Sequence, residues 1–289
     1  MVIRILTSFH SLQEQGESLG PMEQALGRGS VGELIGDIPR GSLVVPRFRA
    51  IPFGELLQRE VEAHGSQLVN TFHQHRNIAD SSNWNHLLGK LTIPEFGVAD
   101  LPDLPEGEYF VKGETNSIKH QWLKSCYAPD RKSLVDIVNN FQRDGFAGNQ
   151  RVVIKSFCHF RQLLNRSGQK LFSLSGQPIW HERRVFVLDG QALAQGFYWS
   201  SFLGDAMPTP IGNGHKFMET LTQVIERTKH LARFYVVDMA ENEDGSWTVI
   251  ELNDGSMSGL SQVDPLELWT NFRKVGSSFN PKVELNLHG

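Results

Sequence analysis

Two apolar runs near the end of this sequence, separated by a short polar segment, constrain the fold most strongly. The runs are FYVVD and TVIELN, and the segment between them contains Asp244-Gly245, a dipeptide typical of the tight turn in a β-hairpin. Side chains alternate between the two faces of a strand, so Glu251 and Asn253 share one face and the apolar residues of VIELN share the other. We therefore expect an antiparallel pair of strands with polar oxygens on one face.

Asp238 ends the first run, where the hairpin would bring it close to Glu251 and Asn253. Mg²⁺ prefers carboxylates, water and phosphate oxygens to a closed protein cage, so the pattern indicates a magnesium site. The same pattern is typical of polar residues that face solvent on a half-exposed antiparallel sheet. The spacing alone leaves both interpretations open.

The rest of the chain, 289 residues in all, is long enough for two or three lobes. In the first eighty or so residues, GSLVVPRF, FGELLQREVEAHG and SQLVNTF predict a strand, a helix and a strand, an order that favours a parallel crossover. The connector LPDLPEGE leads to a strand at YFVKG, a helix at KSLVDIVNNFQRDG and a strand at RVVIKSF. The dipeptide Asp189-Gly190 then predicts another hairpin, and a helix is expected from about His215 to Leu231.

Two lysines end apolar strands in successive regions, Lys112 in YFVKG and Lys155 in VVIKSF. A single lysine at such a position usually reaches solvent, but two of them point to the phosphates or the base of a nucleotide held between lobes. ERRVFV adds Glu182 and Arg184 on one strand face. A carboxylate can bind ribose hydroxyls and an arginine can clamp phosphate, although a surface ion pair is the alternative.

Composition narrows the remaining choices. The formal net charge of −4 argues against a protein that coats nucleic acid, and no apolar run approaches the roughly 20 residues needed to span a bilayer. Cys126 and Cys158 are the only cysteines, so we expect a reducing, cytoplasmic setting and treat both as small hydrophobic residues. His73 and His75 in FHQHR lack a matching zinc ligand set. The six tryptophans are expected in the core or between lobes.

The order of these motifs resembles the ATP-grasp family. The matching segments begin at about Gly107 and are, in the family's order, YFVKG, VVIKSF, ERRVFV, YVVDM and VIELND. The resemblance implies the ATP-grasp fold, of class α/β and α+β, in which an N-terminal α/β lobe precedes two α+β lobes that clamp ATP. The implied domains are an N-terminal lobe at 1–100, a central lobe at 101–155 and a C-terminal lobe with the metal site at 156–289.

The resemblance also implies the chemistry of a carboxylate-amine ligase. ATP phosphorylates a carboxylate, and an amine then displaces phosphate from the acyl phosphate to form an amide. Two Mg²⁺ ions are expected on Asp238, Glu251 and Asn253. The implied nucleotide contacts are Lys112, Thr115, Asn116, Ser117, Lys155, Ser156, Phe157, Glu182 and Arg184. Since Val236 occupies the place where many members have an arginine, the catalytic role is expected for Arg184 or Arg233, together with Lys112.

Two other functions stay open at this point: an ATP-grasp kinase that phosphorylates a hydroxyl, and a nucleotide-binding module without turnover. Specificity is expected from three segments, which are Arg47 to Glu55, the loop from Leu203 to Gly214, and GSMSGL after Asn253. The expected partners are a small-molecule or peptide carboxylate and an amine, with neither nucleic acid nor membrane. The oligomeric state is open, with a homodimer as one option.

Overall fold

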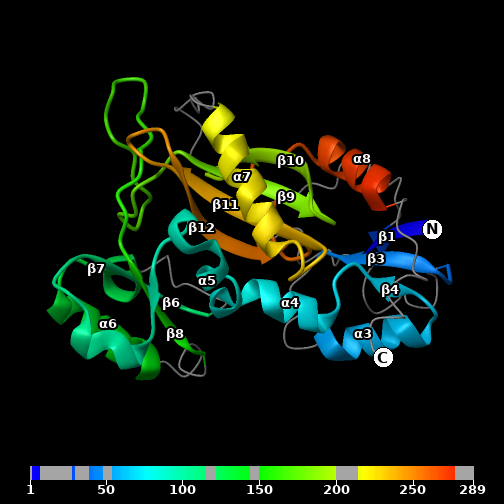
Figure 1. Cartoon of the computed structure of the whole chain (residues 1–289), viewed down its shortest axis with the longest axis horizontal. Coiled ribbons are helices and arrows are strands. Elements are labelled where there is room, and N and C mark those ends of the chain that lie inside the picture. The colour runs from blue at the N-terminus through cyan, green and yellow to red at the C-terminus, as the bar shows by residue number, and fades with distance from the viewer. Residues whose placement is uncertain are drawn as a thin grey trace.

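The computed structural model describes residues 2–6, 28–29, 39–47, 54–114, 122–143, 150–199 and 214–276. Within these ranges the strands form three sheets of four strands each, with the orders β2-β1-β3-β4, β5-β8-β6-β7 and β10-β9-β11-β12. In Figure 1 the last of these sheets lies between the other two. In the described part of the chain, no helix is both long and apolar enough to cross a bilayer.

The N-terminal sheet is parallel, as the strand, helix, strand pattern predicts. Its elements are β1 (Val2–Leu6), β2 (Arg28–Gly29), β3 (Ser42–Pro46), α3 (Gly54–Ala63), β4 (Gln67–Leu68) and α4 (Phe72–Ala79). The predicted strand SQLVNTF is right only for Gln67 and Leu68. Thr71 ends it, because the Thr71 side chain accepts a hydrogen bond from the Gln74 N–H and Gln74 returns one, which is a capping box that starts α4.

The central sheet is antiparallel and is covered by one amphipathic helix. Its strands are β5 (Glu95–Phe96), β6 (Tyr109–Gly113), β7 (Tyr127–Ala128) and β8 (Val152–Ser156). The helix α6 (Arg131–Arg143) buries the four apolar residues that its sequence period predicts, Leu134, Ile137, Val138 and Phe141. Because β5 pairs with β8, this sheet takes in residues that precede position 101; the division of the chain into three domains stays a prediction.

Short helices surround these two sheets. Three of them lead from α4 toward β5, and two more flank β6 and β7. They are η1 (Ser81–Asn83), α5 (Asn85–Leu88), η2 (Gly89–Leu91), η3 (Val98–Asp103) and the π-helical turn η5 (Trp122–Cys126). The connector LPDLPEGE begins inside η3, which Pro102 does not interrupt because its hydrogen-bond pattern is that of a short 3₁₀ segment.

The C-terminal sheet consists of the two predicted hairpins side by side. The first joins β9 (Glu182–Leu188) to β10 (Gln191–Phe197), and the second joins β11 (Phe234–Glu241) to β12 (Trp247–Asp254). Asp189 and Gly190 have φ angles of 47° and 76°, which suit a two-residue hairpin turn. The helices α7 (Gly214–Thr228) and α8 (Pro265–Gly276) complete the lobe.

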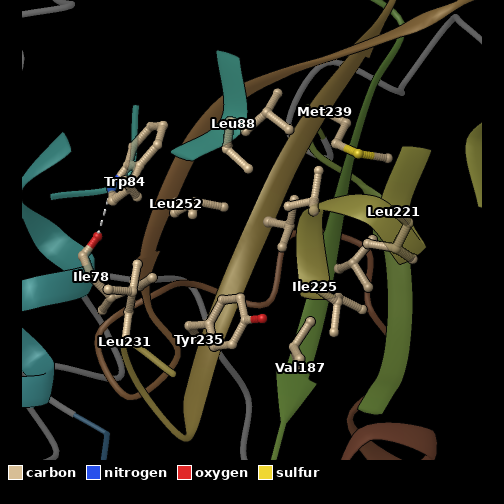
Figure 2. Close-up of a cluster of buried hydrophobic side chains, with 14 of the residues drawn as sticks. Ile78, Trp84, Leu88, Val187, Leu221, Ile225, Leu231, Tyr235, Met239 and Leu252 are labelled. Atoms are coloured by element: carbon tan, nitrogen blue, oxygen red, sulfur yellow. Dashed lines mark hydrogen bonds between the residues drawn. The ribbon is translucent and has the colours of Figure 1, made fainter. Parts of the chain in front are cut away.

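The two faces of this sheet have different partners. One face packs against α7 and the α4–α5 region in a large apolar cluster; Figure 2 shows Val187, Tyr235 and Met239 of the sheet in this cluster, together with Leu221 of α7. The other face buries Phe186, Phe234 and Val236 beside α8, but only toward one end. Toward the other end of that second face the residues are charged, and they form the candidate site.

Candidate active site

Three charged residues form a row across three neighbouring strands. Arg184 of β9 pairs in register with Asp238 of β11, and Asp238 pairs with Glu251 of β12. Asn253 lies opposite Val236, one step further along the same face. The hairpin therefore brings Asp238, Glu251 and Asn253 onto neighbouring positions, as the alternation of VIELN predicts.

An irregularity in the β11–β12 pairing lies next to this row. Asp238 pairs with Glu251, but Met239 pairs with Val249, so Ile250 is an extra residue on β12. The Ile250 carbonyl accepts a hydrogen bond of 3.3 Å from Lys155 Nζ. The bulge thus connects the C-terminal sheet to β8 of the central sheet.

Arg184 and Asp238 form a buried ion pair with two parallel hydrogen bonds. Arg184 Nε and Nη2 donate to the two carboxylate oxygens of Asp238 at 2.9 and 2.8 Å. Arg184 Nη1 also donates to the Gly259 carbonyl at 2.7 Å, and its guanidinium lies 4.7 Å from the centre of the Tyr198 ring. Burial alone would lower the pKa of Arg184, but the Asp238 carboxylate outweighs it and raises the pKa, so Arg184 stays positively charged.

The two predicted lysines lie close to this row. Lys112 is ion-paired with Glu251, and only 7% of Lys112 is exposed. Lys155 is 3% exposed, its Nζ lies 4.0 Å from the Glu95 carboxylate, and the same atom is 5.2 Å from the centre of the Trp84 ring. Burial, followed by the positive charge of Lys112, lowers the pKa of Lys155 to about 8. Both lysines are thus held inside the protein as cations at neutral pH.

These groups border a cleft between the central and C-terminal sheets. The cleft measures about 690 Å³, part of it open to solvent, and β6, β8, β9 and β12 all contribute to its lining. Its charged lining residues include Lys112, Lys155, Glu182 and Glu251. One wall is aromatic and consists of Phe110, Trp122, Phe157, Phe160, Trp180 and Trp199.

Most of the aromatic wall escaped the sequence analysis, which placed the tryptophans in the core or between lobes. Trp122, Trp180 and Trp199 are indeed almost fully buried, but they also line the cleft. Trp122 and Phe157 lie 6.0 Å apart, centre to centre, although they come from different segments. Such a wall depends on tertiary packing, and no local pattern in the sequence identifies it.

The predicted nucleotide contacts are only partly brought together. Lys112, Lys155, Ser156, Phe157 and Glu182 all line the cleft. Glu182 is buried and accepts a hydrogen bond of 2.9 Å from Trp199 Nε1. The predicted phosphate contacts Thr115, Asn116 and Ser117 lie outside the described residues, as does the proposed covering loop up to residue 213.

Arg233 is the predicted site residue that the structure places elsewhere. It lies five residues before Asp238, roughly 16 Å away along an extended chain. Arg233 Nε and Nη2 donate to the two carboxylate oxygens of Asp189 at 2.8 Å each, at the turn between β9 and β10. Of the two candidate arginines, only Arg184 therefore lies in the row with Asp238.

The donor set next to the cleft fits a hard divalent cation. Two carboxylates and one amide oxygen occupy adjacent positions, whereas the described residues contain no cluster of three or more His, Cys, Asp and Glu. Asp238 accepts hydrogen bonds from Arg184, Glu251 from Lys112, and Asn253 Oδ1 from the Asp254 N–H. Each of these oxygens has a second lone pair, so a set of this kind can share Mg²⁺ with phosphates and water rather than enclose it.

Comparison with known proteins places this geometry in a family. Residues 97–272 match the model of an ATP-grasp domain, the third family of one clade of that fold. A sequence search of curated proteins finds no match. The fold is similar to that of a D-cycloserine synthetase, with a TM-score of 0.58 at 14% identity over 94% of this chain and 99% of the other.

Two further solved structures share the fold. A D-alanine–D-alanine ligase from Bacillus anthracis, complexed with ATP, has a TM-score of 0.55 at 14% identity, over 96% of this chain and 99% of that chain. An L-amino acid ligase from Bacillus licheniformis has a TM-score of 0.50 at 13% identity, over 88% and 67%. The match at residues 97–272 spans more than half of the chain and confirms the predicted family and fold class. The chain belongs to the ATP-grasp family.

Proposed function

We propose that this protein is an ATP-dependent carboxylate-amine ligase that forms an amide or peptide bond through an acyl phosphate. The observation that carries the proposal is the convergence of Lys112, Lys155 and Arg184 with Asp238 and Glu251 beside one aromatic-walled cleft. Apolar walls with a few convergent charged groups are typical of nucleotide sites. The three solved structures that share the fold are, by name, a synthetase and two ligases, which supports the same class of reaction.

The aromatic wall suits the base of ATP, and the charged end suits its sugar and phosphates. Glu182, held in place by Trp199, has oxygens that accept hydrogen bonds from ribose hydroxyls. Lys112 and Lys155 supply positive charges that attract phosphate oxygens. Cys158 also borders the cleft, but burial raises the pKa of its thiol, which favours a small apolar lining residue over a nucleophile.

Asp238, Glu251 and Asn253 would hold Mg²⁺, and we propose two ions. When bound, Mg²⁺ neutralises charge that develops on the phosphates during transfer. Lys112 lies against the proposed ligand Glu251 and is placed to bind a phosphate oxygen beside it. Arg184 orients Asp238 through two hydrogen bonds and, as the proposed catalytic arginine, stabilises the acyl phosphate.

Catalysis of this type depends on positioning and electrostatic stabilisation, so no covalent nucleophile is needed from the protein. We propose the domain division at 1–100, 101–155 and 156–289, with the nucleotide between the last two. The substrates would be a small-molecule or peptide carboxylate and an amine, used in the reducing cytoplasm.

The test is a screen for phosphate release from ATP with pairs of acids and amines. A ligase releases phosphate only when both partners are present and yields ADP and an amide. A phosphorylated hydroxyl formed without phosphate release would identify a kinase instead. Tight ATP binding without turnover in every mixture would identify a nucleotide-binding module.

A further inference from the structure

A second cavity lies where the N-terminal lobe meets the turn after β12. It measures about 350 Å³, part of it open to solvent, and β3, β4, α3 and α4 contribute to its lining together with that turn. Its walls are largely apolar, with Leu57, Leu68, Phe72 and Met257 among them. The polar groups that face it include His75 and Ser256. This cavity is separate from the nucleotide cleft, with which it shares no lining residue.

The histidine in this cavity is held in one orientation. His75 Nδ1 lies 3.1 Å from Asp254 Oδ2, and the same oxygen accepts a hydrogen bond of 2.7 Å from Asn70. Asp254 Oδ1 accepts from the Ser256 N–H at 2.6 Å. Because the Asp254 carboxylate requires a proton on Nδ1, the other ring nitrogen, Nε2, presents a lone pair when the ring is neutral.

Two polar atoms at this cavity have no hydrogen-bond partner within the described structure. They are His75 Nε2 and Ser256 Oγ. His75 has 9% of its side chain exposed and Ser256 is 4% exposed, so neither atom is satisfied by bulk water. Buried polar groups are almost always hydrogen-bonded, so an unpaired acceptor and an unpaired hydroxyl at one cavity point to a ligand that supplies their partners.

The charge around the cavity determines what kind of ligand fits. Burial by itself would raise the pKa of Asp254, but the hydrogen bonds from His75, Asn70 and the Ser256 N–H outweigh it and lower the pKa, so the carboxylate is ionised. This negative charge disfavours a carboxylate ligand. The nearby cation Arg47 is not among the lining residues and donates to the Gly255 and Ser256 carbonyls. A compact aliphatic group that carries an N–H or O–H donor satisfies both the walls and Nε2.

The turn after β12 links this cavity to the proposed reaction centre. Asn253, a proposed magnesium ligand, directly precedes Asp254, and Gly259 accepts a hydrogen bond from Arg184. Two of the segments that we expected to determine specificity meet here, since Gly54 comes from one and Ser256 and Met257 come from the other. We infer that this cavity receives the aliphatic part of the amine substrate, with His75 Nε2 and Ser256 Oγ bound to its donor group; this inference rests on the proposed ligase function.

The test is a titration of the full chain, without ATP or Mg²⁺, followed by NMR of ¹⁵N-labelled histidine. The probes are 3-methylbutylamine, 3-methylbutanol and 3-methylbutanoate, which share one carbon skeleton and differ in the head group. We expect the amine and the alcohol to shift the His75 Nε2 resonance saturably and the acid to leave it unchanged. Absence of saturable amine binding, or equal binding of the acid, would overturn the inference and leave a water-filled cavity.

Three variants locate the binding. His75→Phe removes the acceptor and Met257→Trp fills the cavity from a surface turn, so each is expected to weaken amine binding at least tenfold. His73→Phe, on the exposed side of the same helix, is the matched control and should bind the amine like the parent. Met257→Trp also keeps the His75–Asp254 pair, so it remains informative if His75→Phe fails to fold. Unchanged amine binding in Met257→Trp would refute the assignment.

The ligase assay separates the two proposals. If the parent ligates an amine and Met257→Trp shows the same KM for it, the cavity assignment is wrong and the ligase function stands. If the amine binds saturably at His75 but no acid-amine pair supports phosphate release, the ligase function fails, and the substrate role of the cavity fails with it.

Discussion

Arg184 and Asp238 face each other across β9 and β11 and share two hydrogen bonds of 2.9 and 2.8 Å. Both side chains are almost completely buried. Removing one partner of such a pair leaves an uncompensated charge inside the protein. This pair therefore ties the stability of the C-terminal sheet to the proposed chemistry.

Arg184→Ala is expected to abolish acid- and amine-dependent phosphate release and to lower the free energy of unfolding by about 3–5 kcal/mol, because Asp238 would remain buried and charged. Arg233→Ala, which breaks the more exposed pair with Asp189, is expected to keep most of the turnover. Urea unfolding and phosphate release measured on both variants check this. Loss of turnover in Arg233→Ala with an intact fold would transfer the catalytic role to Arg233.

Glu251→Gln is expected to reduce magnesium-dependent turnover by at least about 100-fold while changing the free energy of unfolding by less than about 1 kcal/mol. The side chain is 25% exposed, so its pair with Lys112 is partly screened and contributes little stability. Phosphate release and thermal unfolding are the two measurements. Unchanged activity would disprove the metal assignment, and an unfolded variant would favour a structural role for Glu251.

ATP affinity is expected to fall as the pH rises through 8. The pKa of Lys155 is lowered to about 8 in the free protein, chiefly by burial, so the side chain is cationic below that pH and neutral above it. Since phosphate binding favours the protonated form, the Kd for ATP should rise several-fold between pH 7.5 and pH 9. Calorimetry over this range is the check, with Lys155→Gln as the reference. An equally steep pH dependence in Lys155→Gln would exclude Lys155 as its cause.

The strands and helices of the C-terminal sheet were predictable because their signals are local. Alternation in VIELN and the glycine turns after Asp189 and Asp244 define the hairpins without any long-range information. The same alternation places Glu251 and Asn253 on one face, and strand pairing then brings Asp238 beside them. The metal-site hypothesis could therefore be built from the sequence.

Other parts of the site depend on contacts between distant segments. Trp122 and Trp180 are far apart in sequence and line one cleft only after the central and C-terminal sheets meet. His75 pairs with Asp254 across nearly the whole described chain, whereas its local context, FHQHR, suggested at most a zinc ligand. Neither partner carries a pattern that identifies the other, so only the folded structure reveals the second cavity.

The central claim is that ATP binds between the two C-terminal lobes with Mg²⁺ on the β11–β12 carboxylates. The most direct measurement is calorimetric ATP binding with and without Mg²⁺, on the parent, Lys112→Ala and Asp238→Asn. We predict magnesium-dependent binding in the parent that is weakened at least about tenfold in Lys112→Ala, as expected for loss of a charged hydrogen bond, and that loses its magnesium dependence in Asp238→Asn. No ATP binding by the folded parent protein, or variants that bind as the parent does, would contradict the account.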